Sequence, residues 1–464
     1  MRKLHLVLFL ALSLSCFCQN KQILYNFTSV PQSMLVNPGS DVKYNWFVGL
    51  PLLSGISANI GSSGFSINDL FANNGVDFNT KLRNVVFSTS RNDKVSANEQ
   101  LEIFSGGFKL GDWQSNSYIS FGMYQELDVL TYLPKDYAIL LLDGNKEYLG
   151  KVFDMSDLNI RGELLSVFHV GYHKKVRENL IFGARGKIYS SVFNVSSTKN
   201  SGYFYTLQGT NSIYDQVISA NVSVNTSGFT NYIDNYSGNA KSDILKKTFF
   251  GGNLGLGLDL GLTYYPKENL QFTASLIDIG FINHTKEVES YRYKGYYNYE
   301  GLTPNFIVGN PNGDIIKEFN DAIPLDTLHT KYTTWRPLKF NSSIQYSFGD
   351  GRSVDCNCIG DNENKYTNSV GAQLFAMSTP RSPLMALTAY YKRQISDFLE
   401  MKATYTIDSF SSKNIGLGLS TTLGKVNFYV SADNLLEYRD IAKANSLSFQ
   451  LGLNIIFPNK NTPD

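Results

Sequence analysis

The sequence predicts an all-β protein, a single antiparallel transmembrane β-barrel, on two observations about its 464 residues. First, many segments alternate apolar with small or polar side chains, as strands with one apolar and one polar face do. Second, residues 447–457 keep this alternation longer than the about five or six residues of an ordinary strand, and match the about 9–11 of a tilted membrane strand. Because no run reaches the about 18 apolar residues of a spanning helix, closure into a barrel is the simplest use of so many such strands.

The stretch at residues 254–276 illustrates the pattern. Leucines at even positions from Leu254 to Leu262 alternate with Gly255, Gly257, Asp259 and Gly261, and a second alternating run begins at Leu270. The glycine spacing departs from a dinucleotide fingerprint, and no helix pattern follows it. The stretch therefore predicts a hairpin whose glycines face the crowded interior of the barrel.

The two ends of the chain carry export and insertion signals. Residues 1–18 have a basic start and a short apolar core, which predicts a cleaved signal peptide; a lipoprotein signal is the weaker alternative. We expect residues 19–42 to form a periplasmic lead or a plug, residues 43–457 the barrel, and residues 458–464 a periplasmic tail. Leu453, Ile455 and Phe457 end the last strand and resemble the signal that outer-membrane assembly machinery reads.

Strand counting gives fourteen strands, with sixteen as the alternative. The sixteen-strand version adds the runs at residues 202–208 and 217–224 as one more hairpin through the membrane. With a periplasmic C-terminus, short turns fall on the periplasmic side and long connections outside, as barrels require. The connection at residues 349–366 is the exception, because it is long yet periplasmic.

Composition agrees with this fold. Aromatic residues make up 14% of the chain and charged residues 17%, and 29 tyrosines suit the aromatic girdles of a barrel. The chain is close to neutral, so no basic field indicates nucleic acid as a partner.

The candidate site is the wall of the lumen. We expect polar side chains there to face inward, at His169, His173, Arg185, Lys187, Asp259, Glu400 and Lys402. The four on residues 169–187 could form a cationic patch that attracts anions. The favoured interpretation is that they pair with carboxylates such as Asp259 or Glu400. The two histidines lie about 13 Å apart along a strand, too far to share one zinc ion.

Cys356 and Cys358 are the only cysteines beyond the signal. In an oxidising compartment a strained disulfide between them is the leading interpretation, and redox work lacks support. No cofactor or metal site is predicted.

Catalytic motifs are missing: the chain has neither Gly-x-Ser-x-Gly nor His-Glu-x-x-His. Ser166 lies near His169, but this spacing on a strand points the two side chains to opposite faces. We therefore expect no enzyme.

A resemblance adds to this interpretation. The stretch from Gln32-Ser33 to Asn37-Pro38-Gly39, the Leu50-Pro51 pair and residues 64–69 resemble an uncharacterised family of Bacteroidota outer-membrane proteins in the style of PorV and FadL barrels. The resemblance implies a fourteen-stranded barrel and carries no functional residue over. It implies either passage of a small or hydrophobic solute, or a structural subunit of an envelope complex for type IX secretion or outer-membrane protein assembly. The expected partners are outer-membrane lipid, the barrel-assembly machinery and such envelope subunits.

Overall fold

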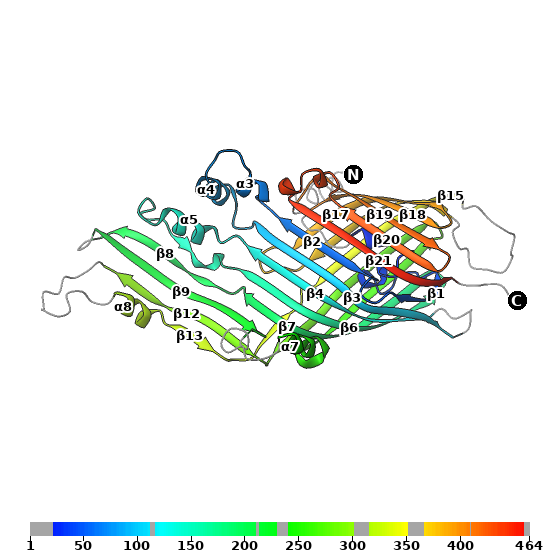
Figure 1. Cartoon of the computed structure of the whole chain (residues 1–464), viewed down its shortest axis with the longest axis horizontal. Coiled ribbons are helices and arrows are strands. Elements are labelled where there is room, and N and C mark those ends of the chain that lie inside the picture. Colours follow the sequence, from blue (N-terminus) through cyan, green and yellow to red (C-terminus); the bar gives the residue numbers. More distant parts are fainter. Residues whose placement is uncertain are drawn as a thin grey trace, which may run out of the picture.

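The computed structural model describes residues 22–111, 117–209, 213–229, 240–300, 315–350, 366–408 and 410–458. Within them the chain forms a closed antiparallel barrel of fourteen strands (Figure 1). The first wall strand is made of two pieces, which both pair with β3 on one side and with β21 on the other, and so close the wall. In order round the barrel the wall strands are β1 (Tyr44–Gly49) with β2 (Ile56–Ser62), β3 (Lys94–Leu110), β4 (Ser117–Tyr132), β6 (Ile160–Arg177), β7 (Leu180–Ser197), β10 (Asn253–Lys267), β11 (Leu270–His284), β15 (Lys339–Asp350), β16 (Tyr366–Met377), β17 (Leu384–Ser396), β18 (Leu399–Ile407), β19 (Asn414–Leu423), β20 (Val426–Asp433) and β21 (Ser446–Pro458).

The fourteen-strand prediction is confirmed, and the sixteen-strand alternative is wrong. The two extra runs lie in β8 (Ser201–Gln208) and β9 (Tyr214–Ser227), which leave the wall instead of crossing it. β9 pairs with the wall where Ser227, Thr226 and Asn225 lie opposite the end of β7, and it pairs along its length with β12 (Val288–Tyr299). Period-two alternation predicts a strand, but it does not predict which other strand that strand will pair with.

β8, β9 and β12 belong to a sheet that projects beyond the barrel rim, in the order β5–β8–β9–β12–β13. β5 (Phe153–Asp154) and β13 (Leu325–Leu328) form its edges, and Figure 1 shows the sheet at the end opposite the C-terminus. Near the rim, β14 (Tyr332–Trp335) extends the pairing of β11 above β15. The sequence predicts most of these segments as long loops outside the membrane, so the projecting sheet differs from that prediction.

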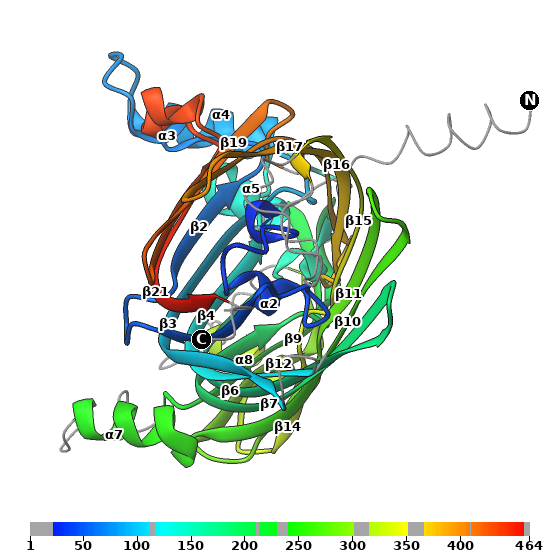
Figure 2. The same ribbon diagram turned by 90° about the vertical axis from the view of Figure 1, so that its right-hand side faces the viewer.

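Helices occupy the same end as the projecting sheet. They are α3 (Ile67–Phe71), α4 (Phe78–Ser88), α5 (Lys135–Asp143) and α8 (Ile315–Ala322), with the shorter turns η2 (Met155–Asp157), η4 (Glu437–Arg439) and η5 (Ile441–Lys443). One further helix, α7 (Ala240–Lys246), lies instead against the outer wall beside β6 and β7 (Figure 2). α4 begins at a cap, since the Asp77 carboxylate accepts a hydrogen bond of 3.0 Å from the backbone N–H of Thr80. No helix in the described ranges is long and apolar enough to cross a membrane.

The wall has two kinds of end and two kinds of face. The connections after β6, β10, β17 and β19 are tight turns, and they lie at the same end as Pro458; we call this the short-turn end. Along β10 the leucines are exposed on the outside, whereas Gly255, Asp259 and Gly261 are buried inside. This is the apolar-out, polar-in arrangement of a membrane barrel.

The first wall strand differs from its prediction. The sequence predicts one strand over residues 43–64, but residues 50–55 interrupt it. Pro51 has no N–H to give to a ladder, and Leu52 adopts a left-handed backbone with φ +63°. Gly49 pairs with Asn454 and Ile56 with Leu451, so residues 50–55 lie opposite only Gly452 and Leu453 of β21. The extra residues form a large bulge, which we call the wall break.

Candidate functional site: a plugged lumen

Residues 22–41 lie inside the barrel, and we call them the plug (Figure 2). The plug contains two short helical turns, η1 (Gln22–Leu24) and α2 (Ser33–Val36). Apolar plug side chains form clusters with the wall: Ile23, Leu24, Phe27 and Val30 pack with Tyr429. Of the two predictions for the N-terminal segment, a lead outside or a plug inside, the structure places residues 22–41 inside.

Glycines on the wall make room for the plug. A Cβ atom added at Gly183 would collide with the carbonyl group of Pro38, and one at Gly261 would collide with Asn37 and Gly39. The Thr263 hydroxyl donates a hydrogen bond of 2.8 Å to the Gly39 carbonyl at the same place. Gly261, in the Gly-rich run of β10, is therefore small because plug backbone lies directly against the wall.

Two buried wall cations hold the ends of the plug helices. Lys402 Nζ donates to the carbonyl oxygens of Tyr25 at 2.5 Å, Ile23 at 3.0 Å and Gln22 at 3.4 Å. Arg185 donates to the carbonyls of Leu35, at 3.2 Å, and of Met34. The last carbonyls of a helix have no partner within it and carry partial negative charge, so a cation there satisfies both needs.

Above the plug, a network of ion pairs crosses one side of the lumen. We call it the ion lattice; it joins equal numbers of cations and carboxylates from β4, β6, β7, β10, β11 and β15, together with Arg336 just before β15. Its pairs are Arg185–Asp259 at 3.2 Å, Lys187–Asp259 at 2.8 Å, Lys187–Asp278 at 2.7 Å, Lys339–Asp278 at 3.0 Å, Lys339–Glu126 at 3.4 Å, Arg336–Glu126 at 3.2 Å and Arg336–Glu163 at 2.9 Å. Because these groups are shielded from water, each charge depends on its partners.

The lumen candidates from the sequence fall into three places on the inner face of the wall. Arg185, Lys187 and Asp259 meet in the ion lattice, which is the pairing interpretation favoured above. Lys402 holds the plug, and Glu400 pairs with Lys392 at 3.2 Å. His173 stacks on Tyr118 with ring centroids 5.2 Å apart, and His169 lies 5.8 Å from Tyr124.

Sequence reasoning missed five members of the lattice: Glu126, Glu163, Asp278, Arg336 and Lys339. Alternation along β11 puts Asp278 on the apolar face of Leu276, and the available signal was this charge in an otherwise apolar run, "SLIDIGF". A bulge at Asp278, whose φ is +65°, turns the carboxylate inward. Their pairing partners lie on other strands and could not be assigned from spacing.

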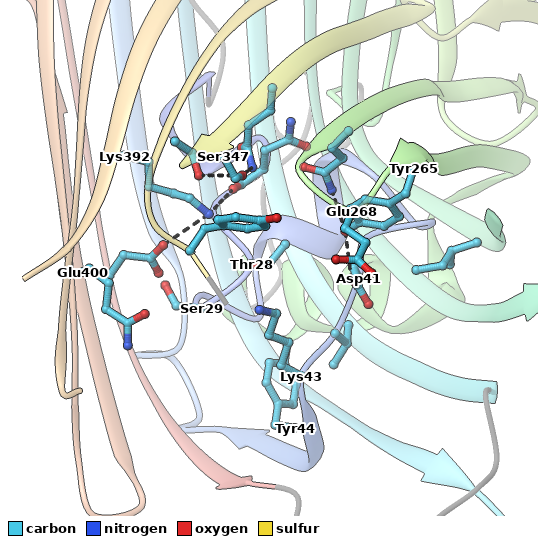
Figure 3. A pocket seen from close by; sticks show the side chains of 18 of the residues that line it. Thr28, Ser29, Asp41, Lys43, Tyr44, Tyr265, Glu268, Ser347, Lys392 and Glu400 are labelled. Carbon is cyan, nitrogen blue, oxygen red and sulfur yellow. Dashed lines mark hydrogen bonds and ion pairs between the residues drawn. The ribbon is translucent and has the colours of Figure 1, made fainter. Parts of the chain in front are cut away.

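A cavity of about 1000 Å³ lies at the short-turn end, between the plug and the wall turns. Figure 3 shows Thr28, Ser29, Asp41 and Lys43 of the chain's N-terminal stretch facing it, with Tyr265, Glu268, Lys392 and Glu400 from the wall. The Tyr265 hydroxyl donates to Asp41 at 2.9 Å. The cavity is polar and carries both signs of charge, as expected for a water-filled mouth.

A smaller space of about 40 Å³ separates the plug from the ion lattice. It lies between Leu35 and Val36 of the plug and Asp278 and Lys339 of the lattice. Plug and lattice therefore lie nearly against each other on this side of the lumen.

The wall break contacts the plug on its inner side. The Glu102 carboxylate accepts hydrogen bonds from Ser54 at 2.8 Å, from Ser105 at 3.0 Å and from Gln32 of the plug at 3.0 Å. On the outer side Leu52 and Leu53 are exposed. One buried carboxylate thus ties an irregular part of the wall to the plug.

The remaining predicted residues lie at the chain's C-terminal end and in a turn. Leu453, Ile455 and Phe457 are on the outer face of β21, where Phe457 stacks on Trp46 with centroids 3.4 Å apart. Cys356, Cys358 and the signal segment lie outside the described residues. Within the described ranges no group of three or more His, Cys, Asp or Glu side chains could hold a metal ion.

A protein-family model described as "Family of unknown function (DUF5723)" matches residues 38–433. No curated protein matches the chain. Solved structures with a similar fold include the toluene transporter TbuX of Ralstonia pickettii (11% identity, 92% of this chain and 94% of that one, TM-score 0.40). Others are the toluene transporter TodX of Pseudomonas putida (10%, 95% and 98%, 0.39) and a FadL homologue of Pseudomonas aeruginosa (10%, 93% and 95%, 0.40). TM-scores this low say nothing about function.

Proposed function

The chain belongs to a family of unknown function, DUF5723, and from its geometry we propose that it is an outer-membrane barrel for gated passage of a small uncharged solute. The observation that carries this proposal is the wall break, which is coupled to the plug through Glu102. In this proposal the protein is exported by its signal segment, inserted by the barrel-assembly machinery, surrounded by lipid, and not an enzyme.

The groups that fill the lumen indicate the route of the solute. A path along the β4–β15 side of the lumen would have to separate ion pairs of the lattice, and leaving a buried charge without its partner costs several kcal/mol. On the opposite side the plug and wall meet through neutral donors, at Ser54, Ser105 and Gln32. Hydrogen bonds to a charged acceptor such as the Glu102 carboxylate contribute about 1.5–3 kcal/mol each, less than the about 3–5 kcal/mol of breaking a buried ion pair. The plug side next to the wall break is therefore the weaker barrier.

The solute class follows from the exit. The outer side of the wall break presents Pro51, Leu52 and Leu53, so a molecule that leaves there enters an apolar surrounding. A charged solute would pay heavily for this transfer, whereas a small apolar or weakly polar one would not.

The test is uptake of radiolabelled toluene by cells that carry the protein in their outer membrane. Deleting residues 50–53 leaves Ser54 and Gly55 opposite Gly452 and Leu453, which makes the first wall strand nearly regular. We expect this deletion to abolish uptake while the barrel still forms, as judged by its heat-dependent gel mobility. The variant Gln32→Ala, which loosens the plug from Glu102, should raise uptake.

Two different outcomes would contradict the exit and the passage function separately. Unchanged uptake after the deletion would show that the wall break is not the exit. Uptake no higher than in cells without the protein, for both the wild type and Gln32→Ala, would end the passage proposal.

A second candidate function, docking to other envelope proteins, is favoured by the projecting sheet. One face of this sheet is covered, since Phe204 and Val222 pack into a cluster with α5 and Phe153, and Tyr297 packs on Phe319 of α8. On the other face Tyr203, Ser219 and Tyr296 lie in one row across three strands, and Tyr296 is 55% exposed. Tyrosines are favoured at protein interfaces because they give much contact area for little loss of conformational entropy.

The docking function predicts the loss of bound envelope proteins instead of the loss of toluene uptake. Replacing Tyr203 and Tyr296 together by serine should remove envelope proteins that co-purify from mild detergent and leave toluene uptake unchanged. Identical co-purifying proteins with and without the two tyrosines would contradict it.

A further inference from the structure

We propose that residues 240–251, which comprise α7 and the turn η3 (Lys247–Gly251), lie in the lipid surface and seal a polar row on the outer wall. We call these residues the outer segment. The proposal rests on the membrane location of the barrel, and it assigns the segment a partner, the outer leaflet, that the passage function does not need.

The polar row consists of Gln125, Ser166 and Ser190. They are neighbours on β4, β6 and β7, because Gln125 pairs with Ser166 and Ser166 with Ser190. The residues before or after them, Tyr124, Val167 and Tyr189, point into the lumen, where they pack together. Alternation therefore places the three polar side chains outside, where the wall would otherwise present them to hydrocarbon.

The outer segment covers this row. Ser190 donates to the Lys247 carbonyl at 2.5 Å, and Gln125 donates to the Thr248 hydroxyl at 3.2 Å. Ser166 and its outward neighbour Met123 are fully buried, although both belong to the outside of the wall. The segment thus replaces lipid as the neighbour of these polar groups.

The turn is fixed by aromatic stacking. The Phe250 ring stacks on Phe168 of β6 with centroids 4.0 Å apart, and Phe250 adopts φ +64°, a backbone that bulky residues rarely take. Such strain persists only where surrounding contacts impose it. The contacts of the outer segment at Phe250, Lys247 and Thr248 are with the outer face of the wall, so the segment is an integral part of that wall.

The surface that the segment turns outward is apolar and continues the apolar belt of the barrel. Leu245, Phe249 and Phe250 are 58%, 54% and 43% exposed, as much as the outward Leu256 of β10, which is 59% exposed. Lys241 and Lys246 are exposed on the same helix, which is the mixture of apolar and basic side chains found in interfacial helices.

Orientation and height match the edge of a membrane. Figure 2 looks towards the short-turn end and shows α7 running across the view beside β6 and β7, whereas Figure 1 shows it nearly end-on, so the helix lies across the barrel axis. At a rise of about 3.3 Å per residue and a tilt of about 40°, Phe168 lies roughly 23 Å above the turn after Arg177. An apolar belt is about 25 Å tall, so the segment sits near its upper boundary.

The experiment measures which solvent reaches the segment. Single cysteines at Leu245, Leu256 and Leu141 are introduced into the mature protein, which lacks residues 1–18 and so Cys16 and Cys18, and which carries Cys356→Ser and Cys358→Ser. Each variant is spin-labelled and reconstituted into phosphatidylcholine vesicles. Collisions with oxygen, which concentrates in lipid, are compared with collisions with a water-soluble nickel chelate. Leu256 is the lipid standard, and Leu141 on α5, which is 88% exposed, is the water standard.

We expect the label at Leu245 to resemble the one at Leu256, with at least a threefold higher ratio of oxygen to nickel collisions than at Leu141. A ratio at Leu245 equal to that at Leu141 overturns the proposal. If the label at Leu256 also reports water, the barrel itself is not in the membrane, and the passage proposal fails with it. A label at Lys246, on the same helix, gives a second measurement. We expect its ratio of oxygen to nickel collisions to lie between those of Leu256 and Leu141.

Discussion

The two sides of the lumen satisfy their buried polar groups in different ways. From β4 to β15, charges meet opposite charges in the ion lattice. From β16 round to β3, apart from the Lys392–Glu400 ion pair beside the cavity at the short-turn end, these groups meet neutral donors: Asp433 accepts from Ser448 at 3.1 Å, Glu102 from Ser54 and Gln32, and Thr388 bonds Thr406 at 2.9 Å. The wall break lies on the second side. The difference indicates that the lattice side is held more strongly, and that the other side exchanges its bonds for water at a lower cost.

The largest expected effect is that of Arg336→Met, on the charged side of the lumen. Glu163 then loses the cation 2.9 Å away, and a buried pair broken at one partner typically costs about 3–5 kcal/mol. The free energy of unfolding should fall by about that much, measured by denaturant titration of the folded band on a gel. Adding Glu163→Gln should restore most of the loss; if the double variant is no more stable than Arg336→Met, the pair is not the reason.

The next test asks whether the neutral side is tolerant only on its inner face. Leu451 lies mid-strand on the outer face of β21, and an arginine at the middle of a bilayer costs about 2–4 kcal/mol. Leu451→Arg should therefore impair insertion strongly, measured by the fraction of folded protein in vesicles. Leu423→Arg, on the outer face beside a turn at the short-turn end, is the matched control and should cost about 0–1 kcal/mol.

Lys402 is a fully buried cation on the neutral side, and it binds backbone carbonyls of the plug. Hydrogen bonds to a charged group contribute about 1.5–3 kcal/mol, so Lys402→Met should loosen the plug by about this amount. Protease cleavage within residues 22–41 should speed up at least tenfold. The exposed lysine in Lys413→Met serves as control, and equal cleavage rates in both variants would exclude Lys402 as the plug's anchor.

The smallest expected effect belongs to a neutral pair. Thr388→Val removes the hydroxyl that bonds Thr406 and Gln22, and a neutral hydrogen bond contributes about 1 kcal/mol. The same titration should show a loss near that value. A loss as large as that of Arg336→Met would erase the distinction between the two sides.

The sequence by itself determined the wall. Alternation at residues 254–262 and 447–457 is a local property, so it assigned the outward leucines, the inward glycines and the fourteen strands correctly. It also placed Arg185, Lys187 and Asp259 on polar faces, because a strand fixes the face of each residue without reference to its neighbours.

Only the tertiary structure decided what fills and surrounds the barrel. The pairing of Arg336 with Glu163, the hydrogen bonds of Lys402 to the plug and the stacking of Phe250 on Phe168 all join segments far apart in the chain. Such contacts arise when the wall closes and brings opposite strands within reach, and period-two alternation holds no information about that distance.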